Sequence, residues 1–245
     1  AAARRRLALL TLVLLSLALL GMIRLPGGAV PTHLHAAGTF AWHGVRNVVL
    51  GPPTVGIQIG HLDSREHPEE LADLRFNTGG EWDGVTEVEI NRAVAHRLAG
   101  LLEARGVEVQ LLPATVPPRY RADLLVAIHA DSNPDTRRRG YKSAVYRRQR
   151  NEWDDRLKEY IDRAYLTGSG LPDDDSNVSG AMLDYYAFNR RFRHSVARGT
   201  PAVIVELGYL SNPADLRLLS DPGRVAALLE AGITDYLVAR GRLRD

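Results

Sequence analysis

Three short apolar runs, each closed by a polar residue, constrain this chain more than any other feature. Each run has the length of a buried strand, and longer segments with helical periodicity separate them. The runs span 55–60, 124–128 and 202–205, and the residues that close them are His61, His129 and Glu206. Strands that alternate with helices form parallel sheets, and the polar groups of such sheets gather at the carboxyl ends of the strands. We therefore expect these three side chains to lie close together.

The segments between and after the runs complete an α/β pattern. Apolar residues recur at helical spacing from Ile90 to Leu102, and Gly106 marks the end of that helix. We also predict strands over 107–111 and 141–146, a helix over 153–165 with Trp153, Leu157, Tyr160, Ile161 and Ala164 on its inner face, a short helix capped by Ser211 or Asn212, and a helix over 225–239. The expected fold class is α/β: a single domain with a mostly parallel twisted sheet flanked by helices.

The first helix begins with two acidic residues that have different expected roles. Thr86 as N-cap and Glu89 three positions later match a capping box. Glu87 occupies the first helical position, where its side chain is free to point away from the helix end. A metal ion is one candidate partner for Glu87. A solvated carboxylate that stabilises the helix N-terminus is the alternative.

The residue types at these positions favour metal-assisted hydrolysis. Two imidazoles and a carboxylate are a common ligand set for catalytic Zn²⁺, which keeps a fourth position open for water. A further carboxylate nearby can serve that water as a general base. The sequence contains no cysteine, which excludes disulfides, thiolate ligands and a cysteine nucleophile. The pattern therefore predicts a zinc hydrolase.

The remaining histidines are assigned other places. His33, His35 and His43 lie in a stretch rich in proline and glycine, where we expect them to be solvated. His96 falls on the polar or boundary face of the first helix. His67 is the one spare imidazole that can approach a metal. Arginines surround His194, and we expect it on a basic surface or a substrate-binding rim.

An export signal precedes the predicted domain. Residues 7–23 form an uncharged, leucine-rich stretch between three arginines and Arg24. At about 17 residues the stretch is at the short limit for a membrane span. We expect residues 1–24 to be an uncleaved membrane anchor, with a cleaved signal peptide or a buried helix as alternatives. Residues 25–53 are then a linker, and residues 54–240 are the catalytic domain, on the extracytoplasmic side of the envelope.

The formal net charge of +2 constrains the partners only weakly. Lysine occurs only at positions 142 and 158, and we attribute the excess of arginine to genome composition rather than to function. A mild affinity for anionic polymers or membrane surfaces is compatible with this charge. We expect no nucleic-acid partner.

At these residues the chain resembles the zinc-dependent N-acetylmuramoyl-L-alanine amidases of the type-3 family, which cut peptidoglycan between glycan and stem peptide. Four motifs carry the resemblance, which covers residues 54–238. They are Gly60-His61, Glu87-Val88-Glu89-Ile90-Asn91, Ile128-His129-Ala130, and Pro201 to Glu206 followed by Tyr209-Leu210-Ser211-Asn212. The resemblance implies that His61, Glu87 and His129 bind zinc and that Glu206 is catalytic. The implied substrate is peptidoglycan or a muropeptide, cut at the amide between N-acetylmuramic acid and L-alanine.

Departures from the family pattern affect the rim of the expected site. Leu62 and Asp63 stand where the family usually has two glycines, and a leucine cannot adopt positive φ without strain. Asp131 stands where the family usually has asparagine. The polar segment Leu62–Val85 is longer than expected, and because both its ends are fixed at the site we predict that it forms the rim. The candidates for substrate contact are Arg65, Arg75 and the Asn77–Gly80 turn; a surface insertion without substrate contact is the alternative.

Two other functions remain open at this point. A zinc carboxypeptidase, or another amidohydrolase of the envelope, would use a similar ligand set together with an arginine that holds a substrate carboxylate. A catalytically degenerate envelope-binding protein is suggested by the altered glycine pair. Retention of Glu206 weakens that reading, because a protein that only binds has no need for a proton carrier.

Overall fold

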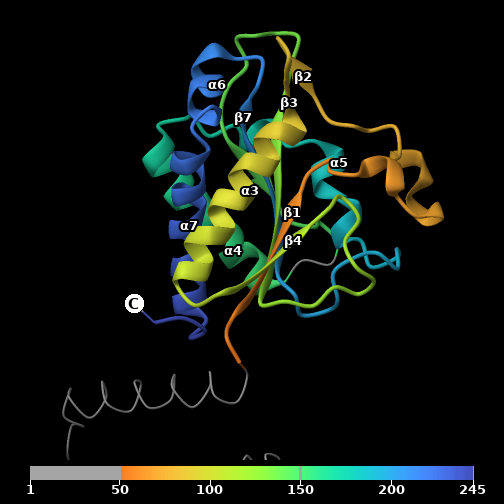
Figure 1. Cartoon of the computed structure of the whole chain (residues 1–245), viewed down its shortest axis with the longest axis vertical. Helices are drawn as coiled ribbons and strands as arrows, with labels where there is room; N and C mark the ends of the chain where they lie inside the picture. The colour runs from red at the N-terminus through yellow and green to blue at the C-terminus, as the bar shows by residue number, and fades with distance from the viewer. Residues whose placement is uncertain (1–50, 149–150, 245) are drawn as a thin grey trace, which may run out of the picture. The chain divides into compact units, whose positions relative to one another are not determined.

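A computed structural model describes residues 51–148 and 151–244 (Figure 1). Its centre is a five-stranded sheet in the order β4-β1-β5-β7-β6. The strands are β1 (Thr54–Ile59), β4 (Glu108–Leu112), β5 (Leu124–Asp131), β6 (Lys142–Ala144) and β7 (Ala202–Tyr209). β4, β1, β5 and β7 run parallel, and only β6 at the edge is antiparallel to its neighbour. The predicted mostly parallel sheet is confirmed.

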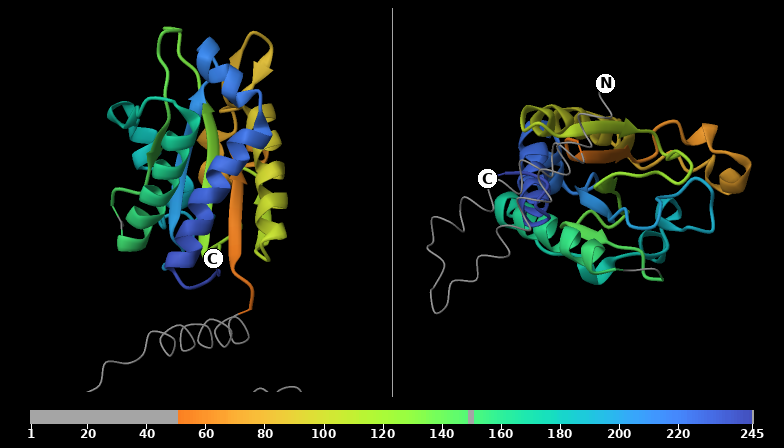
Figure 2. Two further views of the ribbon diagram at one scale, coloured as in Figure 1. Left: turned by 90° about the vertical axis from the view of Figure 1, so that its left-hand side faces the viewer. Right: turned by 90° about the horizontal axis from the view of Figure 1, so that it is seen from below.

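Three long helices cover one face of this sheet. They are α3 (Glu87–Ala104), α4 (Glu152–Ser169) and α7 (Pro222–Ala239). α7 lies between the other two and packs against both, as the left view of Figure 2 shows. The shorter elements are α5 (Gly180–Leu183), α6 (Pro213–Leu219), the hairpin of β2 (Glu81–Trp82) and β3 (Val85–Thr86), and the 3₁₀ segments η1 (Ser64–Glu66), η2 (Glu69–Leu74), η3 (Asp175–Asn177) and η4 (Tyr186–Phe188).

Successive strand residues face two different apolar cores, because side chains alternate along a strand. On β5, Val126 belongs to the core beneath the helices. Its neighbours Leu125 and Ala127 belong to a second core, which the irregular segments 112–122 and 178–196 cover. The sheet therefore has a helix-covered face and a loop-covered face, and residues two positions apart on a strand share a face.

This alternation decides where the polar strand ends point. His129 has the same parity as Ala127, and Glu206 has the same parity as Ile204 of the loop-covered core. The two residues are direct partners in the β5–β7 register. Both functional strand ends therefore meet on the loop-covered face, at the carboxyl edge of the sheet.

Most predicted elements lie within a few residues of the observed ones, and one predicted burial is wrong. Asn212 is the cap of α6, because its side chain accepts hydrogen bonds from the amides of Ala214 and Asp215. Trp153, predicted on the inner face of α4, is 36% exposed. It lies in the first turn of α4, where the guanidinium of Arg240 covers its ring from outside the core at 4.2 Å.

The predicted anchor, residues 1–24, and most of the predicted linker lie outside the described residues. Within the two described ranges, no helix combines the length and the apolar character that a membrane span requires.

Candidate metal centre

Glu87 reaches the carboxyl edge of the sheet because Glu89 takes over the capping of α3. The Thr86 hydroxyl accepts the Glu89 amide, and the Glu89 carboxylate accepts the Thr86 amide, at 3.3 and 3.0 Å, as the capping box predicted. Glu87 is thereby left free, and its buried side chain lies between His61 at the end of β1 and His129 near the end of β5.

The three predicted ligands form a compact cluster. Glu87 Oε1 lies 2.8 Å from His129 Nδ1, and Glu87 Oε2 lies 3.4 Å from His61 Nε2. One donor atom from each residue falls within 4.8 Å of the other two. The two imidazole rings are almost perpendicular, with centroids 4.8 Å apart. The geometry brings together the three residues that the sequence placed on separate elements.

The hydrogen bonds around the cluster test whether it suits a cation. His61 Nδ1 lies 3.0 Å from the carbonyl oxygen of Asn77, which can only accept, so the proton belongs on Nδ1 and the lone pair on Nε2 faces Glu87. The far nitrogen of His129 is likewise engaged, by the hydroxyl of Tyr185 at 3.0 Å. Two imidazole nitrogens and a carboxylate that converge on one point need positive charge between them, which either protons on the imidazoles or a metal ion can supply. The donor set therefore fits a divalent metal, and its chemistry suits Zn²⁺.

Hydrogen bonds to the ionised form keep Glu87 charged. Burial raises the pKa of this carboxyl, but the hydrogen bonds and charges of His129 and His61 outweigh burial and hold it well below its usual range. Further donors are the amide of Gly80 at 2.9 Å and the side chain of Asn91 at 3.3 Å. For His61 the balance has the opposite sign: burial lowers its pKa, and Glu87 raises it by more. In both cases the site favours a carboxylate beside positive charge.

Glu206 lies beside this cluster without belonging to it. Its Oε2 atom is inaccessible and has no hydrogen-bond partner among the described residues. Burial raises the pKa of Glu206 well above its usual range, the negative charges of Glu87 and Asp131 raise it further, and Lys142 opposes them. A carboxyl group held in this way can both take up and release a proton.

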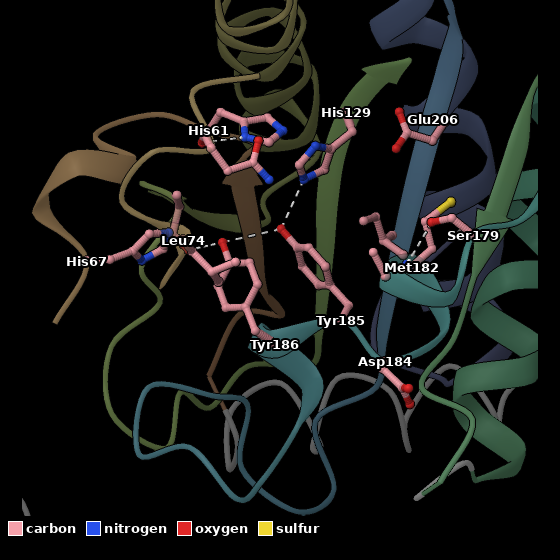
Figure 3. Close-up of a pocket in the computed structure, with 14 residues that line it drawn as sticks. His61, His67, Leu74, His129, Ser179, Met182, Asp184, Tyr185, Tyr186 and Glu206 are labelled. Carbon is pink, nitrogen blue, oxygen red and sulfur yellow. Dashed lines mark hydrogen bonds between the residues drawn. The ribbon is translucent and has the colours of Figure 1, made fainter. Parts of the chain in front are cut away.

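A pocket of about 280 Å³ opens at the cluster (Figure 3). His61, His129 and Glu206 form one end of its wall, and Tyr185, Tyr186 and Met182 form much of the remainder. No arginine or lysine is among the described residues that line it. A small substrate group can therefore approach both the metal ligands and Glu206 from one cavity.

The family can now be assigned from sequence and geometry together. Residues 55–235 match the type-3 family of N-acetylmuramoyl-L-alanine amidases. The chain belongs to this family. The matched residues contain the sheet from Val55 onward, all of α3 and α4, and α7 as far as Asp235, and the membership makes the protein a peptidoglycan-cleaving enzyme.

Solved structures share the fold of this amidase. Ami1 from Mycobacterium smegmatis is 20% identical over 77% of this chain and 98% of its own, with a TM-score of 0.56. The catalytic domain of CwlV from Bacillus (Paenibacillus) polymyxa var. colistinus is 20% identical over 76% and 98%, with a TM-score of 0.54. CwlD from Clostridioides difficile, solved in complex with the GerS lipoprotein, is 18% identical over 76% and 99%, with a TM-score of 0.51. No curated protein matches the chain.

The long segment 62–85 runs along the rim of the amidase pocket. Its residues His67, Leu74 and Asn77 line the cavity, and Leu71 anchors the segment in the protein. The strain expected at Leu62 does not occur: the positive φ angles fall on His61 (61°) and Asp63 (55°), and Asp tolerates that region better than Leu. Contact between this segment and the substrate stays a prediction.

Of the candidate arginines and spare histidines, Arg75, His67 and His194 have other partners. The Arg75 guanidinium donates to the carbonyl of His67 and to Glu69, within the segment itself. His67 Nδ1 lies 2.6 Å from the Thr115 hydroxyl, so this imidazole lines the pocket but does not join the metal ligands. His194 pairs with Glu70, and His96 is exposed on α3.

The sequence did not indicate several residues that complete the site. Asn91 stands one helical turn after Glu87, and that spacing was a usable signal for its contact. Tyr185 and the carbonyl of Asn77 carried no such signal, because each reaches its histidine through tertiary structure alone. Lys142 pairs with Asp131, and on β6 it is the direct register partner of Glu206 on the neighbouring strand β7.

Proposed function

We propose that this amidase binds one Zn²⁺ through His61, Glu87 and His129 and uses Glu206 as its proton carrier to hydrolyse the amide between N-acetylmuramic acid and L-alanine. The observation that carries the proposal is the convergence of two imidazole nitrogens on the Glu87 carboxylate, 2.8 and 3.4 Å away. The unpartnered oxygen of Glu206 in the same pocket supports the role of that residue.

When bound, Zn²⁺ supplies Lewis acidity for the substrate carbonyl and lowers the pKa of a coordinated water towards about 7. Glu206 accepts the proton of the attacking water and donates it to the leaving nitrogen of L-alanine. The burial that raises the pKa of Glu206 lets it hold this proton between the two steps. The buried pocket wall excludes bulk water from the reacting groups.

Asp131, the second candidate for the general base, is already committed to another partner. Its carboxylate pairs with the ammonium of Lys142, which also donates to the Tyr209 hydroxyl at 2.8 Å. Its other oxygen accepts the Ser132 amide at 2.7 Å, so both oxygens of Asp131 already have donors. Glu206 therefore remains the proton carrier in this proposal.

The pocket lining separates this function from its rivals. A carboxypeptidase holds the terminal carboxylate of its substrate with a cation, and the described residues of this pocket include no arginine or lysine. An amide within a glycan–peptide linkage needs no such cation. A protein that only binds the envelope would have no use for a buried carboxyl kept free of partners.

We propose an extracytoplasmic location, with residues 1–24 as the anchor or signal that brings the enzyme to peptidoglycan. The family's substrate lies outside the cytoplasm, and the charge pattern of these residues is typical of export.

Metal analysis combined with digestion of purified peptidoglycan tests the proposal. We expect one zinc per chain and products whose masses correspond to cleavage between the lactyl group and L-alanine. His129→Ala should lose the metal and the activity together. Full metal occupancy in His129→Ala would exclude this ligand set, and products that lack a terminal D-amino acid would point to a carboxypeptidase.

A further inference from the structure

Tyr185 has no role in the proposed mechanism, yet its side chain contacts His129, one of the proposed metal ligands. Its hydroxyl lies 3.0 Å from His129 Nε2 (Figure 3), and Nδ1 of the same ring lies 2.8 Å from Glu87. Tyr185 is buried just before η4, and its ring meets the imidazole edge to face, with centroids 5.7 Å apart. The phenol therefore holds the side of His129 that faces away from Glu87.

A short chain of hydrogen bonds fixes the direction in which this phenol donates. The Tyr186 hydroxyl lies 2.7 Å from the carbonyl oxygen of Ala114, which can only accept, so Tyr186 donates there. Its oxygen is then available as an acceptor, and it receives the Gln58 side-chain amide at 3.2 Å and the Tyr185 hydroxyl at 3.5 Å. Because the Tyr185 proton points to Tyr186, its oxygen accepts a proton from His129.

The direction of this chain determines the protonation of the imidazole. A neutral histidine carries its proton on one nitrogen only. When Nε2 donates to Tyr185, a metal ion can replace the proton through which Nδ1 contacts Glu87 at 2.8 Å, and the Nδ1 lone pair then points at that ion. The opposite tautomer would place an N–H where a metal needs a lone pair.

We propose that Tyr185 is a positioning residue that holds His129 in the tautomer protonated on Nε2 and thereby sets the affinity of the site for a divalent metal. The inference rests on the proposed ligand set. It assigns to a phenol the task that the backbone carbonyl of Asn77 performs for His61. A carbonyl oxygen can only accept a hydrogen bond, whereas a hydroxyl can donate or accept. The contact to Tyr186 determines which of the two the Tyr185 hydroxyl does.

Removal of the hydroxyl tests the proposal. Tyr185→Phe keeps the ring and its packing, and we expect its zinc affinity, measured by competition with a chromophoric chelator, to fall about 10- to 100-fold. At saturating zinc most of the kcat should return, because the hydroxyl acts through the ligand and not on the substrate. Tyr186→Phe should show a smaller loss of affinity, since Tyr185 then loses only its acceptor.

Tyr165→Phe is the matched control. The Tyr165 hydroxyl is also buried and donates to a backbone carbonyl, that of Leu207, at 2.8 Å on the helix-covered side. We expect this variant to lose stability while its zinc affinity is unchanged. A loss of zinc affinity as large as that of Tyr185→Phe would mean that any buried hydroxyl matters, and it would overturn the proposal.

A measurement on the unmodified protein keeps the test independent of folding defects. In the zinc-loaded chain, long-range ¹H–¹⁵N NMR of ¹⁵N-labelled histidine should show His129 protonated on Nε2 and not on Nδ1. A proton on Nδ1, or unchanged zinc affinity in folded Tyr185→Phe, contradicts the role of Tyr185. Absence of zinc binding in the unmodified chain would instead contradict the ligand set itself.

Discussion

The two faces of the sheet are built in different ways. Long helices cover one face, and the core beneath them, from Val55 to Leu243, consists of apolar residues and tyrosines. Irregular segments cover the other face, where the buried polar atoms without a hydrogen-bond partner among the described residues include Gln58 Oε1, Tyr120 OH and Glu206 Oε2. Asn91 Oδ1 on α3 is a further such atom. A buried polar atom without a partner costs stability.

This difference separates stability from chemistry. The helix-covered face has the larger apolar core, and we expect it to supply most of the folding free energy. The loop-covered face holds the pocket, where Glu206, the carboxyl that we propose as the proton carrier, needs to be free of partners in order to exchange protons. Substitutions on the two faces should therefore change different measured quantities.

The largest expected effect is on the loop-covered face. Glu206→Gln removes the proton carrier, and because general acid–base catalysis contributes about 10²–10⁴-fold, kcat should fall at least about a hundredfold. Zinc content and thermal stability should not decrease, since the buried oxygen has no partner to lose. Turnover of purified peptidoglycan measures the first quantity, and calorimetry the second. Near-normal turnover would assign the proton transfer to another group.

The corresponding substitution on the helix-covered face should act on folding. Leu98 is fully buried on α3, and Leu98→Ala should lower the free energy of unfolding by about 2–5 kcal/mol. The control is Leu101→Ala on the same helix, because Leu101 is 39% exposed and should cost much less. Denaturant unfolding gives both values. If the folded Leu98→Ala enzyme lost kcat as strongly as Glu206→Gln, the two faces would not be separable.

A smaller effect concerns the segments that cover the loop face. The Glu70 carboxylate accepts the amides of Arg193 and His194, each at 2.8 Å, and so ties the rim segment to the chain before β7. Burial raises the pKa of Glu70, but these hydrogen bonds together with His194 outweigh burial and lower it to about 2 from an ordinary value of 4.5. A lowered pKa means that the contribution is complete above about pH 4.5 and is lost as pH falls through about 2.

Glu70→Gln should therefore accelerate hydrogen exchange of the Arg193 and His194 amides at pH 7, with little effect on global stability. The difference in amide exchange rate between Glu70→Gln and the unmodified protein should stay constant down to about pH 4.5 and shrink below that pH. Glu66→Gln, at an exposed carboxylate on the same segment, is the control. A difference that grows towards acid pH would mean that Glu70 does not bind as a carboxylate.

Local sequence signals predicted the parts of the site that depend on neighbours along the chain. The end of each apolar run located His61, His129 and Glu206, and the capping box left Glu87 as the free carboxylate, because a helix can use only one of the two acids in that box. The wrong burial of Trp153 shows the limit of this reasoning, since helical periodicity alone does not reveal that Asp154, which accepts the Ala202 amide of β7, takes the buried position in that turn.

The sequence by itself determined the fold class and the order of the strands and helices, and it indicated the four residues that we propose for the chemistry, because periodicity, capping and strand ends act over a few neighbouring positions. Only the tertiary structure decided how these residues are held. Tyr185 contacts a histidine 56 positions away, and Glu70 contacts amides more than 120 positions away. Such contacts form where irregular segments fold over the sheet, and their geometry depends on packing across the whole domain rather than on any local pattern.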